Sequence, residues 1–292
     1  MNSITKPEYF YKYVTLQGAA NIFYRKGLKW SCPLEFNDPF DLHRDIGFGF
    51  SDEDYFEHFK KRAIELRGNG EPIRNNSEVW ENIRSKSQWI TDDECESFWG
   101  TQKNEVMENH HTLLRQFKNS WNEQVPRYRV LCLSENESDL LMWAHYADMH
   151  RGAVIRFKCI NDQKSHFKDA KPVIYSQSFP FLASLDNWVN QCIGVGVQLD
   201  DKEIFHRIVH TKSEHWGYER EWRCIVDSEF HLKVGQVQLY DIMPEEIDGI
   251  IFGCRADLAT SEIIKKYIHL ELPHVKFQHA TLKQNEYNLE YL

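Results

Sequence analysis

The amino-acid sequence predicts an α+β fold with a mainly antiparallel sheet and a helical insertion after the first two strands. Short strand-like runs at residues 9–14 and 28–31 flank a helical pattern at 17–25. Between residues 51 and 125, large apolar side chains such as Tyr55 and Trp99 recur at helical spacing among dense charges, which predicts helices. Beyond Pro126 short strand-like runs return, and this mixture of elements favours the α+β class.

The second half of the chain alternates expected strands and helices. We expect strands at residues 129–133, 153–157, 173–175, 222–226, 237–240, 250–252 and 275–279. We expect helices at residues 140–149, 181–191, 202–215 and 261–270. Gly68, Gly70 and Pro72 should divide the helical insertion. The organisation predicted is one domain over residues 1–292, with 51–125 as a helical insertion or subdomain.

Composition and charge are typical of a globular chain, and the sequence also indicates a cellular compartment. Apolar residues make up 41% and charged residues 27% of the 292 positions. The 35 Lys and Arg against 44 Asp and Glu give a net charge of -9, which disfavours non-specific nucleic-acid binding. The start of the sequence does not resemble a signal peptide, and no long apolar run is present. We therefore expect a cytoplasmic chain with no membrane partner, whose 7 scattered cysteines are reduced thiols.

The segment from Lys212 to Arg223, KSEHWGYEREWR, is the richest in chemistry. If it forms a strand, Glu219, Glu221 and Arg223 share one face while Tyr218 lies on the other. Same-face neighbours on a strand are roughly 6.5 to 7 Å apart, so the two carboxylates would engage different parts of one substrate while Arg223 holds an anionic group or orients one acid. A solvated strand face with a surface ion pair is the alternative interpretation.

A second candidate is His145, on the helical pattern at 140–149. Asp148 follows three residues later on the same helix face, so His145 is a candidate general acid or base oriented by that carboxylate. A structural histidine held by hydrogen bonds is the alternative.

A third candidate is the Asn37-Asp38-Pro39 turn, which is followed by Asp41. Its acids are candidates to orient a substrate hydroxyl or to bind a hard cation. Asx residues before proline also commonly serve only to form the turn, which is the alternative.

Other well-known signatures are missing. His206 and His210 have i, i+4 spacing but no His-Glu-x-x-His pattern and no third ligand, so we expect no metal site. The sequence also contains no Gly-x-Ser-x-Gly elbow and no Gly-Lys-Ser/Thr phosphate loop, which disfavours serine hydrolases and P-loop NTPases.

The same clusters resemble a bacterial family catalogued as domain of unknown function 2971. The resemblance covers most of the chain outside the helical insertion, and its name states no activity. It rests on the following residues: Tyr11-Lys-Tyr13 with Gly27 and Leu28, the 31–41 turn ending in Phe-Asn-Asp-Pro-Phe-Asp, Leu131-Cys-Leu-Ser134, Met142-Trp-Ala-His-Tyr-Ala147 with His150 and Gly152, and Lys212 through Tyr218-Glu-x-Glu-Trp-Arg223.

A more distant resemblance is to the ADP-ribosyltransferases, in the order of strands and the late Glu-x-Glu. It implies a split sheet and a site for NAD. By this resemblance Glu221 holds the nicotinamide ribose, Glu219 orients the acceptor, and Tyr11 or Tyr13 takes the first-strand position. The first strand departs from that family because it lacks a clear His or Arg.

The same resemblance implies further residues of the cofactor site. Ser134 ends the central strand, and Lys212 and Arg223 would meet the pyrophosphate. His145 or Tyr146 would line the pocket, with Tyr218 in its wall.

The function implied is an ADP-ribosyltransferase-like enzyme that binds NAD and transfers ADP-ribose to a macromolecule, or hydrolyses NAD. Its partners would be a nucleotide-type small molecule and a protein or nucleic-acid acceptor, and a bacterial toxin or phage-defence role would suit this chemistry. Two alternatives stay open. One is a non-catalytic module that binds a ligand or partner, and the other is a metal-dependent nuclease using Asp38, Asp41 and the two glutamates.

Overall fold

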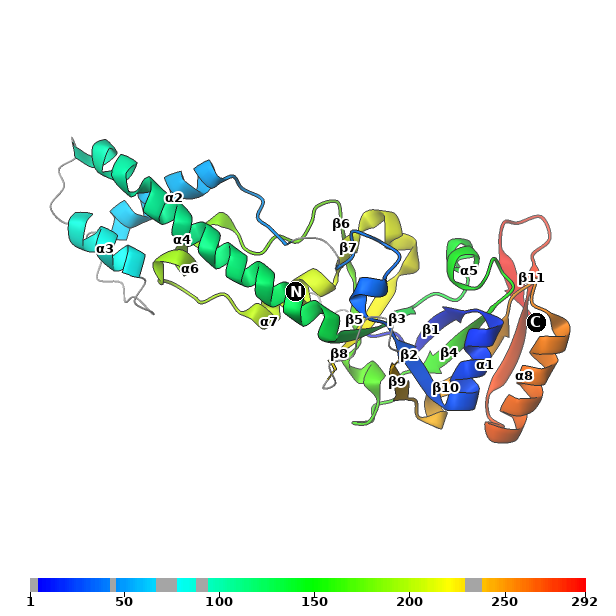
Figure 1. Cartoon of the computed structure of the whole chain (residues 1–292). Helices are drawn as coiled ribbons and strands as arrows, with labels where there is room; N and C mark the ends of the chain where they lie inside the picture. Colours follow the sequence, from blue (N-terminus) through cyan, green and yellow to red (C-terminus); the bar gives the residue numbers. More distant parts are fainter. Residues whose placement is uncertain (1–4, 43–45, 67–77, 88–93, 229–237) are drawn as a thin grey trace. The chain divides into compact units, whose positions relative to one another are not determined.

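The chain folds into two compact units in a computed structural model, which describes residues 5–42, 46–66, 78–87, 94–228 and 238–292 (Figure 1). The sheet unit comprises Met1–Asp41, Pro126–Ser178 and His210–Leu292, and the helical unit comprises Leu42–Val125 and Phe179–Val209. The helical stretch expected at 51–125 therefore lies in the helical unit, which also includes residues 179–209. The breaks expected at Gly68, Gly70 and Pro72 lie outside the described residues.

The sheet unit is built on a mixed sheet in the order β12-β11-β10-β4-β1-β3-β8-β5. Its neighbouring strands are antiparallel except β10 and β11, which are parallel and joined through α8 (Leu258–Glu271). The predicted α+β class with a mainly antiparallel sheet is confirmed. The strands are β1 (Tyr9–Val14), β3 (Tyr128–Ser134), β4 (Ala153–Lys158), β5 (Lys171–Pro172), β8 (Glu221–Asp227), β10 (Ile247–Phe252), β11 (Lys276–Leu282) and β12 (Leu289–Tyr291).

β1 and β3 are neighbours in this sheet but share very little of its hydrogen-bonded ladder. β1 is in register with β4 over six residue pairs, whereas one pair, Tyr11 with Ser134, registers β1 with β3 among the described residues. Continuing that antiparallel register would pair Tyr13 with Cys132, but these two residues are not paired with each other. The sheet therefore opens between β1 and β3.

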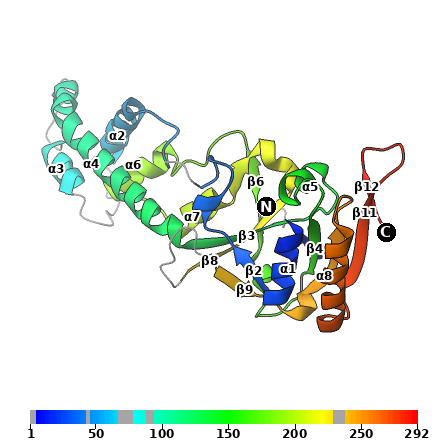
Figure 2. The ribbon, with the colours of Figure 1, turned by 45° about the vertical axis from the view of Figure 1, so that its right-hand side comes forward.

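Strand alternation sends the two faces of the sheet to different cores. On one face, Phe10 packs with Phe157 and with the apolar side chains of α1 (Leu16–Arg25) and α8. On the other face, Tyr13 packs with Trp143 of α5 (Leu140–Tyr146). Helices α1 and α8 therefore cover one face and α5 covers the other (Figure 2).

Two small ladders complete the sheet unit. β2 (Gly27–Trp30) pairs with β9 (Gln238–Asp241), and β6 (Ile174–Ser176) pairs in parallel with β7 (Thr211–Ser213). The helix expected at 202–215 was wrong in its second half: α7 (Asp201–Val209) ends at Val209 and Lys212 lies on a strand. Tertiary pairing with β6 overrides the helical periodicity there.

The helix expected at 140–149 ends early, at Tyr146. Asp148, Met149 and His150 follow with φ of 48°, 53° and 67°, which is a left-handed turn of three non-glycine residues. The turn brings the chain to Gly152, where a Cβ would lie 2.1 Å from the carbonyl oxygen of Val14. Helix α5 therefore ends where the chain must turn sharply to pass close to β1 and enter β4.

The helical unit has its own core. Aromatic side chains from several helices, including Tyr55, Trp99 and Trp188, pack together there. No helix among the described residues is both long enough and apolar enough to cross a membrane. The helices are α2 (Asp52–Leu66), α3 (Glu78–Ser87), α4 (Cys95–Gln124), α6 (Leu185–Ile193) and α7.

Candidate active site

A cavity of about 430 Å³ opens in the sheet unit where β1 and β3 separate. This volume falls in the usual range for small-molecule sites. Its wall combines aromatic rings with charged groups. The lining residues are Tyr11, Lys12, Tyr13, Ser31, Glu35, Phe36, Asn37, Asp41, Cys132, Leu133, Ser134, Met142, His145, Tyr146, Lys212, Glu219, Glu221 and Arg223.

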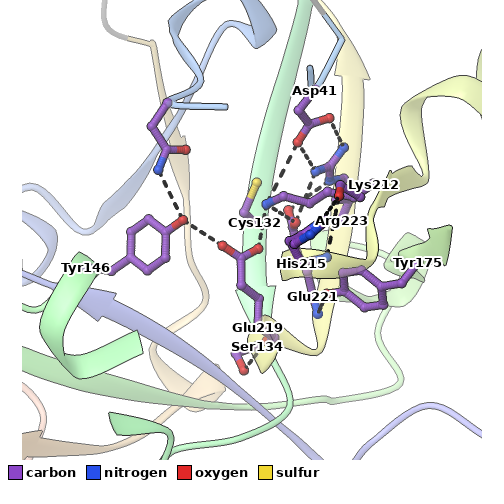
Figure 3. A network of polar contacts seen from close by, with 12 residues as sticks. Asp41, Cys132, Ser134, Tyr146, Tyr175, Lys212, His215, Glu219, Glu221 and Arg223 are labelled. Carbon is purple, nitrogen blue, oxygen red and sulfur yellow. Dashed lines mark hydrogen bonds and ion pairs between the residues drawn. The ribbon is translucent and has the colours of Figure 1, made fainter. Parts of the chain in front are cut away.

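A buried ionic cluster forms one side of the cavity. The Arg223 guanidinium donates through Nε to Oε1 of Glu221 at 2.8 Å, and through Nη1 to Oδ1 of Asp41 at 3.0 Å. Phe36 places its ring 5.5 Å from the same guanidinium. Arg223 is 1% exposed, so its buried guanidinium needs negative charge to balance it and acceptors for its N–H groups, and the two carboxylates supply both (Figure 3).

A second buried cation, Lys212, joins the two glutamates. Its Nζ lies 2.5 Å from Oε2 of Glu219 and 3.1 Å from Oε2 of Glu221. All three side chains are less than a tenth exposed. Three carboxylates, counting Asp41, therefore face two cations inside the protein.

Glu219 reaches the cavity from a different local structure than the sequence predicted. The expected strand over 218–220 was wrong, because η5 (Glu214–Glu219) is a 3₁₀ helix and Arg220 has a left-handed φ of 44°. Strand β8 begins only at Glu221. The two glutamates meet through Lys212, and the turn at Arg220 orients their side chains independently.

Hydrogen bonds hold this turn in place. The Ser134 hydroxyl donates to the carbonyl oxygen of Glu219 at 2.7 Å. The backbone N–H of Glu221 donates to the Tyr175 hydroxyl at 2.8 Å. Ser134 and Tyr175 thus position the main chain on either side of Arg220.

The Glu219 carboxylate has a second donor in Tyr146. The Tyr146 hydroxyl donates to Oε1 of Glu219 at 2.6 Å and accepts from Nδ2 of Asn37 at 3.4 Å. Helix α5 thus supplies Tyr146, which points to Glu219 (Figure 3), and Asn37 comes from the segment that follows the 3₁₀ helix η1 (Pro33–Glu35).

The surroundings of the two glutamates move their pKa values in opposite directions. Burial opposes ionisation of Glu221, but the Arg223 and Lys212 charges outweigh it and lower the pKa of this carboxyl below its ordinary value of 4.5. Burial and the Glu221 charge raise the pKa of Glu219 above 4.5, against Lys212 and Tyr146. Pairs of acids separated in this way are the usual arrangement for one fixed charge and one proton-exchanging group.

The two carboxylates also differ in their free acceptor positions. A carboxylate offers about four lone-pair positions. Glu221 accepts from Nε and Nη2 of Arg223 and from Lys212. Glu219 accepts from Tyr146 and Lys212 among the described residues. Glu219 therefore retains acceptor capacity for a ligand.

Comparison with known proteins gives one match, to a family model that covers part of this site. Residues 142–224 match the model of a family described as "Protein of unknown function (DUF2971)". No curated protein and no solved structure matches the chain.

The match to this family confirms part of the resemblance seen in the sequence. The matched segment contains His145, Tyr146, Lys212, both glutamates and Arg223. The motifs at 11–13, 31–41 and 131–134 lie outside it.

Of the other site residues expected from the sequence, Tyr11, Tyr13 and His145 line the cavity and Tyr218 does not. Tyr11 and Tyr13 line the cavity, and Tyr13 donates its hydroxyl to the carbonyl oxygen of Asn136. His145 lines it as well, exposed and beside the ring of Tyr218, which is not a lining residue. His145 has no hydrogen bond to Asp148 within the described ranges, because α5 ends between them.

The Asn37 to Asp41 turn contributes only some of its polar groups to the cavity. Asn37 and Asp41 line it, and Asp41 is paired with Arg223. Asp38 accepts from the backbone N–H of Phe40 and is not a lining residue. A nuclease-type metal site would need open oxygens on these acids, but Asp41 and Glu221 share the Arg223 guanidinium.

Sequence reasoning missed Lys12, Cys132 and Tyr175 as site residues. Tyr175 lies on a strand that the sequence predicted, but no local pattern connects it with β8. Lys12 lies between the two tyrosines of β1, where alternation assigns it to the opposite face. Its position in the cavity depends on the opening between β1 and β3.

The helical unit contains a cluster with the composition of a metal site: Asp52, His110 and His111. The indole N–H of Trp188 donates to Nδ1 of His110 at 2.8 Å. Because Nδ1 accepts this hydrogen, the ring carries its own hydrogen on Nε2, and burial and the neighbouring His111 lower the pKa of His110 below 6.5. That nitrogen faces Asp52 as a donor, so it has no lone pair to offer an ion in this arrangement.

Proposed function

We propose that this chain is an ADP-ribosyltransferase-like enzyme that binds NAD in the cavity and breaks the bond between nicotinamide and ribose. The ADP-ribose then passes to a protein or nucleic-acid acceptor, or to water. The observation that carries this proposal is the Glu219 carboxylate: it lies in the cavity wall, has free acceptor capacity and has a raised pKa.

The chemistry needs a negative charge beside the ribose. When the C1′–N bond breaks, its electron pair leaves with the nicotinamide nitrogen, and the ribose becomes an oxocarbenium-like cation. A carboxylate in a cavity that excludes water stabilises this charge strongly. The rings of Tyr11, Tyr13 and Phe36 supply the water-excluding wall.

The second half of the reaction needs a base. The acceptor oxygen forms a bond to C1′ and gives up its proton, which Glu219 takes. A carboxyl whose pKa is raised is a better base near neutral pH than an ordinary one. Glu219 would therefore both stabilise the cation and accept the proton.

Glu221 has a supporting role in this proposal, which exchanges the roles implied by the family resemblance. Its carboxylate is occupied by Arg223 and Lys212. It fixes Lys212, which in turn fixes Glu219. Arg223 and Lys212 are likewise committed to carboxylates.

The test is nicotinamide release from NAD by the purified chain, with mass spectrometry of cell extract to detect transferred ADP-ribose. Glu219→Gln keeps the shape of the side chain and removes its charge, so we expect at least a ~100-fold loss of release with unchanged thermal unfolding. Glu262→Gln is the matched control, because it makes the same change on α8, where Glu262 is exposed, paired with Lys265 and not a lining residue. We expect this control to stay within about 3-fold of the native rate.

Two results would contradict the proposal. Release that survives in a folded Glu219→Gln variant would remove Glu219 from the reaction. No release and no NAD binding by the native chain would favour the non-catalytic binding module.

A further inference from the structure

Lys12 occupies the opening between β1 and β3. Its Nζ donates to the carbonyl oxygen of Cys132 at 2.7 Å. If the ladder continued, the backbone of Cys132 would lie opposite Tyr13. The Lys12 ammonium therefore donates a hydrogen bond to β3 at the point where its pairing with β1 has stopped. The side chain of Lys12 also lines the cavity.

The charges around the cavity distinguish Lys12 from the other two cations. Arg223 is held by Asp41 and Glu221, and Lys212 by Glu219 and Glu221. Lys12 forms no ion pair with a carboxylate among the described residues, and a carbonyl oxygen accounts for one of its three donors. It is therefore the lining cation whose charge is available to a ligand.

We infer that Lys12 binds a phosphate group of the ligand that enters this cavity. An ammonium is a compact charge that suits a phosphate oxygen, and here it is half-buried, where screening by water is reduced. The identity of the ligand as NAD rests on the proposed function, whereas the phosphate contact rests on the charges of the cavity. Lys12 thus takes the role that the resemblance implied for Lys212 and Arg223.

The test is calorimetric binding of three probes: inorganic pyrophosphate, ADP-ribose and nicotinamide riboside, which has no phosphate. Lys12→Gln is the informative variant, because its amide still donates to the Cys132 carbonyl while the charge is lost. We expect pyrophosphate and ADP-ribose to bind about 10-fold or more weakly to this variant and nicotinamide riboside to bind as before. Lys12→Arg should recover most of the lost affinity.

Lys276→Gln is the matched control, since it removes one exposed positive charge from the same unit outside the cavity lining. We expect it to leave all three affinities unchanged. Native affinity of Lys12→Gln for pyrophosphate and ADP-ribose would overturn the inference, and so would equal weakening of nicotinamide riboside. If the native chain binds pyrophosphate through Lys12 but releases no nicotinamide, the phosphate site stands and the proposed reaction fails.

Discussion

The hydroxyl of Tyr146 lies 2.6 Å from Oε1 of Glu219, so the last residue of α5 and the last residue of η5 meet over the cavity. Burial and the neighbouring Glu219 raise the pKa of Tyr146, which keeps its hydroxyl protonated as a donor. Helix α5 is attached to the sheet through Trp143, which is completely buried. The position of the Glu219 carboxylate therefore depends on where α5 ends.

Tyr146→Phe should lower turnover while leaving the cavity intact. The substitution removes one of the two donors to Glu219, and hydrogen bonds to charged groups contribute about 1.5–3 kcal/mol. We expect kcat for nicotinamide release to fall about 10-fold with a small change in KM. Because the Tyr146 hydrogen bond lowers the pKa of Glu219, its loss should move the acidic limb of the pH–rate profile to higher pH.

Tyr9→Phe is the control for this substitution, since Tyr9 lies on β1 and is not a lining residue. It should leave both kcat and the pH profile unchanged. An unaltered pH–rate profile in Tyr146→Phe would show that Glu219 is not the titrating group.

The two glutamates should change the pH dependence of stability in opposite directions. The pKa of Glu219 is raised in the folded chain, so from about its ordinary 4.5 upward the folded state binds more protons and stability falls as pH rises. The pKa of Glu221 is lowered, so its contribution is present above 4.5 and is lost as pH falls toward the folded value.

Urea unfolding of the native chain, Glu219→Gln and Glu221→Gln between about pH 3.5 and 7.5 measures these slopes. Relative to the native chain, Glu219→Gln should gain stability as pH rises, and Glu221→Gln should lose it. Slopes of the same sign in both variants would contradict the opposite pKa directions.

Gly152→Ala should destabilise the sheet unit by about 3 kcal/mol. The added Cβ would lie 2.1 Å from the carbonyl oxygen of Val14, which is backbone at the end of β1 and cannot rotate away. Gly217→Ala is the matched control, because a Cβ there meets no described atom within 4 Å. Thermal unfolding compares the two, and a similar melting temperature for both variants would contradict the close approach at Gly152.

The sequence alone determined the α+β class, most strand positions and the residues rich in chemistry. Alternation and helical spacing are local patterns, so the runs at 9–14 and 153–157 appear in the structure as β1 and β4. The spacing of Glu219, Glu221 and Arg223 also predicted that the arginine lies close to a glutamate. Local patterns failed where tertiary contacts override them, as at β7 and in the turn at Arg220.

Only the tertiary structure decided which charged side chains of the cavity pair with one another. Asp41 pairs with Arg223 across 182 positions, and Tyr146 reaches Glu219 across 73. No local periodicity encodes contacts of this length, and Lys12 faces the cavity only because β1 and β3 separate beside it. The sequence therefore supplied the acids and bases of the site, but the fold decided their partners: Lys212 lies between the two glutamates, Arg223 between Glu221 and Asp41, and Lys12 against a carbonyl oxygen. Buried charges must be paired where the chain brings them together.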